Sequence, residues 1–107
     1  MKPYYVQMYF NEKDYDRAIS EGNSLLNESL SKEYSAEVHK IIGESYFMKG
    51  DYASAYPHLK IYLDGQPNPS ESDLYEMGFV SAQLKKYDEA VSYYNRLINS
   101  NSATSQN

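Results

Sequence analysis

Apolar residues recur along this chain at spacings of three and four residues, with short polar stretches between them. This spacing places the apolar side chains on one face of a helix. The order i, i+4, i+7, i+8 is complete in two places, namely Ala55, Leu59, Tyr62 and Leu63, and Ala90, Tyr94, Leu97 and Ile98. The pattern predicts six helices, at roughly 3–12, 15–28, 33–48, 52–64, 70–84 and 87–100.

Turn and capping residues fall between the predicted helices. Residues 49–51 and 85–86 read as short turns, and Pro69 prevents a continuous helix into residue 70. Ser70 is a good N-cap residue, and Asp73 stands at the capping-box distance from it. We expect Pro57 near the first turn of its helix, where a missing N–H group costs little.

One short motif occurs three times. In each copy a tyrosine precedes an alanine by three residues, and two copies also have a glycine twelve residues before the alanine. The residues are Tyr15 and Ala18, then Gly43, Tyr52 and Ala55, then Gly78, Tyr87 and Ala90. The alanines are 37 and 35 residues apart, so we infer three internal repeats of two helices each.

The repeated motif resembles the tetratricopeptide repeat, a helix–turn–helix unit of about 34 residues. The second repeat is the most similar, with Gly43, Tyr46, Gly50, Ala55 and Pro67 at the positions where the family has these residue types. The resemblance implies an all-α, right-handed α-solenoid of three helix-turn-helix repeats. These would span roughly 1–30, 33–67 and 70–102 of a single domain, 1–107.

The other two repeats depart from the family pattern. The departures are Val6, Gly22 and Leu30 in the first repeat, and Ser81, Lys85 and Ser102 in the third. Ser81 and Lys85 stand where tyrosine and glycine are usual, and Gly22 stands where a bulky apolar residue is usual. Small residues at the shared positions are expected to let the paired helices approach closely.

The last predicted helix has an apolar face that no later element covers. Its residues are Val91, Tyr94, Leu97 and Ile98. Repeat arrays normally end with a polar capping helix, and we expect Ser102–Asn107 to be the loop and first residues of a fourth repeat. Two interpretations stay open: the chain is a fragment of a longer array, or a second copy covers this helix in a homo-oligomer.

Composition and charge exclude several classes of partner and of chemical site. The 107 residues carry a net charge of −5, which argues against binding to nucleic acid or to an anionic membrane surface. The absence of cysteine excludes disulfides, thiol catalysis and the usual zinc sites. The apolar runs are too short to span a bilayer. The chain as given shows no signal peptide, so its localisation is open, cytoplasmic by default, although a signal could precede the fragment.

Tyrosine is the most unusual feature of the composition, with 13 residues. A tyrosine buries a large ring but needs a partner or water for its hydroxyl group. We therefore expect the repeated tyrosines to form a thin-layered core close to the surface. They are Tyr5, Tyr9, Tyr15, Tyr46, Tyr52, Tyr62, Tyr87 and Tyr94.

No set of residues indicates catalysis. His39 and His58 lie in different predicted helices without a carboxylate at a known ligand spacing, so packing or surface roles are favoured over metal binding. The glycines are scattered and form no phosphate-binding loop. Residues 27–29 match the short glycosylation acceptor pattern, which we attribute to chance. We expect a non-enzyme without cofactor or metal.

The resemblance implies a concave groove lined by the first helix of each repeat. Carried over position by position, the lining residues are Gln7, Phe10, Asn11, Glu37, Lys40, Glu44, Phe47, Met48, Glu71, Tyr75, Phe79, Ala82 and Gln83. Aromatic rings with three acids around one lysine suit a partner that is apolar and basic. The alternative is that Phe10 and Phe47 are packing residues. Glu44 also argues against the family's clamp for a C-terminal carboxylate.

The sequence thus favours a non-catalytic module that binds a peptide or protein segment in its concave groove, or that scaffolds a complex. The alternatives are a structural spacer or self-association segment of a larger repeat protein, and an accessory domain of an enzyme. A fold of this kind does not by itself identify the ligand.

Overall fold

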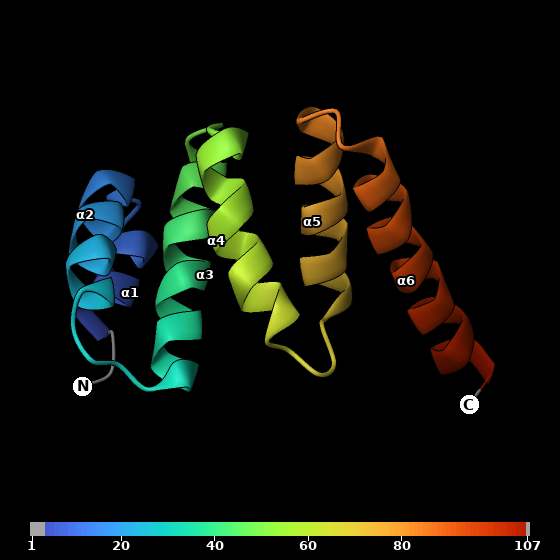
Figure 1. The fold of residues 1–107 in the computed structure, drawn as a ribbon, viewed down its shortest axis with the longest axis horizontal. Helices are drawn as coiled ribbons and strands as arrows, with labels where there is room; N and C mark the ends of the chain where they lie inside the picture. Colours follow the sequence, from blue (N-terminus) through green and yellow to red (C-terminus); the bar gives the residue numbers. More distant parts are fainter. Residues whose placement is uncertain (1–3, 107) are drawn as a thin grey trace. The chain divides into compact units, whose positions relative to one another are not determined.

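The computed structural model describes residues 4–106, with side chains described for residues 4–100. Within this range the chain forms six α-helices and no strand (Figure 1). They are α1 (Tyr4–Asn11), α2 (Tyr15–Leu26), α3 (Lys32–Met48), α4 (Tyr52–Asp64), α5 (Glu71–Gln83) and α6 (Tyr87–Gln106). Consecutive helices pack in pairs, which confirms the all-α repeat fold.

The helix ends agree with the sequence prediction except at the last helix. We expected α6 to end near residue 100, but its backbone stays helical to Gln106. The prediction that a loop lies within Ser102–Asn107 is therefore wrong over Ser102–Gln106, while Asn107 lies outside the described residues. The physical reason is that this stretch contains no glycine or proline to end the helix. The expectation of a fourth repeat stays a prediction.

Contacts divide the chain into two compact units, Met1–Gly65 and Gln66–Asn107. In the first unit, α1 packs on α2 and α3, α2 packs on α3, and α3 packs on α4. Its buried core is aliphatic, with Val6, Leu25, Val38 and Ile42 almost fully enclosed. The expectation of a single domain with three repeats within a longer array stays a prediction.

Two glycines permit close helix packing in the first unit. A Cβ atom on Gly43 of α3 would lie 2.7 Å from side-chain atoms of Leu59 in α4. A Cβ atom on Gly22 of α2 would lie 2.7 Å from Cγ1 of Ile42 in α3. Gly22 therefore explains one departure from the family pattern: Ile42 fills the space that a bulky residue at position 22 would occupy.

The second unit consists of α5 and α6, which pack on each other. Ser70 caps α5 as predicted, since its Oγ accepts a hydrogen bond of 3.1 Å from the backbone N–H of Asp73. Leu74, Met77 and Val80 are buried. Tyr93 of α6 is also buried, with 6% of its surface exposed.

The prediction that the repeated tyrosines form the core is wrong. Tyr93, which is not among them, is the buried tyrosine of the described residues, whereas Tyr87 is 61% exposed. Tyr9 and Tyr46 pack against the aliphatic core and remain half-buried. The physical reason is that aliphatic side chains fill the helix–helix layer without a polar atom, so the tyrosines take the edge, where their hydroxyl groups reach water.

The turn inside each helix pair has the same backbone conformation. Lys13, Gly50 and Lys85 hold the equivalent position and have φ angles of 64°, 78° and 62°. This left-handed region suits glycine and strains other residues. The three turns therefore have the same backbone geometry, although the first and third repeats have lysine at the position where the second has glycine.

Pro57 lies one turn further into α4 than we predicted. It is the sixth residue of the helix, which continues without a break from Tyr52 to Asp64. The carbonyl of Ala53 therefore lacks its usual backbone N–H donor. Ala53 and Pro57 are both exposed, so water can satisfy that carbonyl and the helix accommodates the proline.

Candidate binding surface of the first unit

A cavity of about 250 Å³ opens between α1 and α3. Gln7 and Phe10 line it from α1, and Lys40, Ile41 and Glu44 line it from α3. Four of these five residues belong to the predicted groove lining, and Ile41 does not. We define these five residues as the α1/α3 cavity.

Helix geometry explains why these residues share one surface. On α1, Gln7 and Phe10 are three residues apart, and on α3 Lys40 and Glu44 are four apart, so each pair lies on one side of its helix. Next to them, the buried core residues Val6 of α1 and Val38 and Ile42 of α3 hold the two helices against α2. Sequence analysis missed Ile41, because position 41 is not among the family positions from which the groove lining was carried over.

The polar groups of the cavity are not equivalent. Gln7 Nε2 donates a hydrogen bond of 3.0 Å to Asn11 Oδ1, which leaves the Gln7 carbonyl oxygen as an acceptor. Lys40 Nζ lies 5.0 Å from the ring centre of Tyr62 in α4, in a cation–π contact. Glu44 is half-buried and has no hydrogen bond or ion pair with any residue that the structure describes. The acceptor groups therefore dominate the cavity.

The two phenylalanines of the first unit also serve packing. Phe10 contacts Tyr15 edge-on at 5.6 Å between ring centres, and Phe47 contacts Tyr52 at the same distance. The interplanar angles are 61° and 62°, so the same edge-on aromatic contact spans the turn in both repeats. The packing alternative thus has support for both residues, while Phe10 lines the cavity as well. In the third repeat Ala82 stands at this position, and Tyr87 is exposed beside it.

The remaining predicted residues lie on two separate units. Glu37 and Met48 are exposed on α3, and Asn11 is exposed on α1. The last five predicted residues lie on α5, in the second unit: Glu71, Tyr75 and Gln83 are exposed, and Phe79 and Ala82 are half-buried. A continuous groove across all three repeats stays a prediction.

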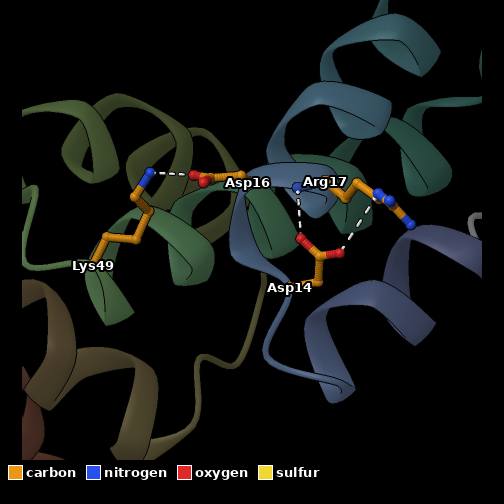
Figure 2. Close-up of polar contacts among 4 residues, drawn as sticks. All are labelled: Asp14, Asp16, Arg17 and Lys49. Carbon is orange, nitrogen blue, oxygen red and sulfur yellow. Dashed lines mark hydrogen bonds and ion pairs between the residues drawn. The ribbon is translucent and has the colours of Figure 1, made fainter.

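A second polar surface joins the turns of the first two repeats. Lys49, which follows α3, forms an ion pair with Asp16 of α2, and Asp14 caps α2 by accepting a 3.2 Å hydrogen bond from the backbone N–H of Arg17 (Figure 2). The hydrogen bond to Asp16 raises the pKa of Lys49 above its ordinary value. These contacts pair opposite charges and link the turns of the two repeats. No pattern in the sequence predicts an ion pair between residues 33 positions apart.

His39 of α3 and His58 of α4 meet within the first unit. Their Nδ1 atoms are 2.9 Å apart and their ring centres 5.1 Å apart. The nitrogen atoms therefore lie close to the line between the ring centres, which is the geometry of one N–H donating to the other ring. If the two histidines bound one metal ion, their nitrogen lone pairs would instead both point toward the position of that ion. Among the described residues, no three His, Cys, Asp or Glu side chains gather in a metal-binding arrangement.

The environment favours the neutral form of both histidines. Burial lowers the pKa of His39 below 6.5. Burial also lowers the pKa of His58, and the neighbouring His39 adds to this effect. The ring of Tyr46 stacks on His58 with centres 6.2 Å apart. The expectation that these histidines have packing or surface roles agrees with this arrangement, although no pattern in the sequence predicts that they meet.

Comparison with known proteins identifies the repeat. Residues 74–103 match the tetratricopeptide repeat family. This match and the six paired helices fit a repeat fold of the tetratricopeptide type, in agreement with the resemblance seen in the sequence. Proteins of this family generally act as non-catalytic interaction or scaffold modules. No curated protein matches the chain. None of the helices in the described residues is both long and apolar enough to cross a lipid bilayer.

Proposed function

We propose that this tetratricopeptide-type chain is a non-catalytic module whose α1/α3 surface binds an apolar and basic segment of another protein. The observation that carries the proposal is the α1/α3 cavity, where Gln7, Phe10, Lys40 and Glu44 come together from two helices. Apolar walls give a segment contact area, and the acidic Glu44 favours a basic partner. The family's general role as an interaction module supports the same function.

The test is selection of binding peptides from a displayed library of random sequences. We expect enriched peptides to contain apolar and basic residues and to bind the chain measurably by calorimetry. The double variant Gln7→Arg/Glu44→Lys should lose these peptides while keeping its helical circular dichroism, because both side chains lie at the surface of their helices. Glu28→Lys, which makes the same charge change as Glu44→Lys but in the exposed loop after α2, is the control for that substitution.

Two results would overturn the proposal. The first is a library that yields no peptide with saturable binding. The second is a set of peptides that bind the double variant as tightly as the unaltered chain.

One observation favours a second candidate, a self-association segment. Val91 and Ile98 of α6 are 56% and 58% exposed, and they share one side of the helix with Tyr87, which is also exposed. Such a stripe suits a second copy of the chain. Light scattering tests this candidate: we expect a concentration-dependent dimer that Val91→Glu/Ile98→Glu abolishes. A monomer at all concentrations would exclude self-association.

A further inference from the structure

We propose that the α1/α3 cavity accepts a single lysine or arginine side chain of the bound segment, with Glu44 as its counter-charge. The inference rests on the proposed function and specifies the chemistry of the partner at this one position. It is carried by the contrast between Glu44 and Lys40, which lie one helical turn apart on α3 yet have different surroundings.

Lys40 does not neutralise Glu44. A lysine four residues before a glutamate on a helix is close enough to form an ion pair. Here the Lys40 ammonium group lies instead against the ring of Tyr62, 5.0 Å from its centre. Glu44 has no hydrogen bond or ion pair within the described part of the chain. Its carboxylate therefore gains from an incoming cation, because a charge-assisted hydrogen bond stabilises both groups.

The walls of the cavity suit the rest of a basic side chain. Phe10 and Ile41 give an apolar surface for the methylene groups of lysine or arginine. The Gln7 side-chain carbonyl is a second acceptor, since its amide nitrogen is already committed to Asn11. A lysine ammonium or an arginine guanidinium group has donors for both oxygens.

The size of the cavity limits the occupant. Its volume is about 250 Å³, whereas small-molecule pockets run from about 300 to about 1,000 Å³. The cavity therefore fits one side chain better than a cofactor or a folded ligand. An acidic side chain is disfavoured, because it would place a second carboxylate beside Glu44.

The experiment is an NMR titration of the isotope-labelled chain with single blocked amino acids. The probes are the N-acetyl methylamides of arginine, lysine, norleucine and glutamate, where norleucine has the lysine stem without its charge. We expect saturable shifts at Gln7, Phe10, Ile41 and Glu44 with arginine and lysine. Norleucine should bind at least about fivefold more weakly, and glutamate should cause no saturable shift.

Glu44→Gln should weaken arginine binding at least about fivefold while keeping the shape of the side chain. Glu33→Gln removes an exposed acid three turns away on α3 and should leave the binding unchanged. Equal binding of norleucine and lysine, or unchanged arginine binding in Glu44→Gln, would overturn the inference. In that case peptide selection still tests the proposed function by itself, because a segment can bind this surface without a basic anchor. Conversely, the arginine and lysine probes could bind while the library yields no peptide. That result would support a cation-binding cavity and refute the proposed binding of a protein segment.

Discussion

His39 in α3 and His58 in α4 place their Nδ1 atoms 2.9 Å apart, so one ring donates its N–H group to the other. This bond needs one nitrogen with a hydrogen and one with a free lone pair. If both rings carry a positive charge, both Nδ1 atoms bear hydrogens and the bond is lost. The link between the two helices is therefore sensitive to protonation.

We predict that the free energy of unfolding decreases as the pH falls below about 6.5. Burial lowers the pKa of both histidines in the folded chain, whereas in the unfolded chain they keep the ordinary value of 6.5. The unfolded state thus binds more protons in this range, and the stabilising contribution is complete above pH 6.5 and lost as the pH falls through the folded-state pKa values. Urea unfolding at about pH 7.5 and about pH 5.5 measures the effect.

The control for this prediction is the double variant His39→Gln/His58→Gln. Carboxylates elsewhere titrate equally in both proteins, so the difference between their pH slopes isolates the histidine pair. Identical slopes in the two proteins would show that the pair contributes no pH dependence.

Two buried serines should respond oppositely to alanine substitution. Ser45 Oγ donates a hydrogen bond of 2.7 Å to the Ile41 carbonyl, whereas Ser81 Oγ is buried without a hydrogen-bond partner among the described residues. Removing the unsatisfied hydroxyl should stabilise the chain, so Ser81→Ala should raise the free energy of unfolding by about 1 kcal/mol. Ser45→Ala should lower it by about 1 kcal/mol. Denaturant unfolding of the two variants provides the comparison, and destabilisation by Ser81→Ala would disprove the first expectation.

The turns of the first and third repeats should accept glycine. Lys85 has a φ angle of 62° and stands where the second repeat has Gly50, with a φ angle of 78°. Lys85→Gly should therefore stabilise the chain by up to about 1 kcal/mol, because the left-handed conformation costs a non-glycine residue about that amount. Gly50→Ala is the reciprocal control. A Cβ atom there meets nothing within 4 Å, so its expected loss of stability reports backbone strain alone. A stabilising Gly50→Ala would contradict this account.

The sequence predicted the helices and their pairing well, because these depend on local patterns. Apolar spacing places the helices, and Ser70 signals the start of α5. The position of Gly43 also anticipates its close contact with Leu59. The error at the end of α6 has the same origin: the polar residues after residue 100 resemble a loop in composition, yet nothing among them stops a helix.

The candidate site was less predictable, because it depends on contacts between helices. The family resemblance indicated Gln7 and Glu44, but no pattern in the sequence showed that Lys40 would turn to Tyr62. The meeting of His39 with His58 is equally invisible, since 19 residues and a turn separate them. Which of several neighbours a side chain contacts depends on packing. The spacing of residue types along the chain does not determine this packing.

The contact between Lys40 and Tyr62 should control the charge of the α1/α3 cavity. Tyr62→Leu has no aromatic ring and removes the cation–π contact of the Lys40 ammonium group, which favours pairing of the lysine with Glu44 one turn away. We expect Tyr62→Leu to weaken the binding of N-acetyl-arginine methylamide about threefold or more. The double variant Lys40→Met/Tyr62→Leu removes the competing ammonium group and should restore the binding. NMR titration of the four proteins, with Lys40→Met as the fourth, gives the coupling between the two residues. Additive effects in this cycle would show that Tyr62 does not act through Lys40.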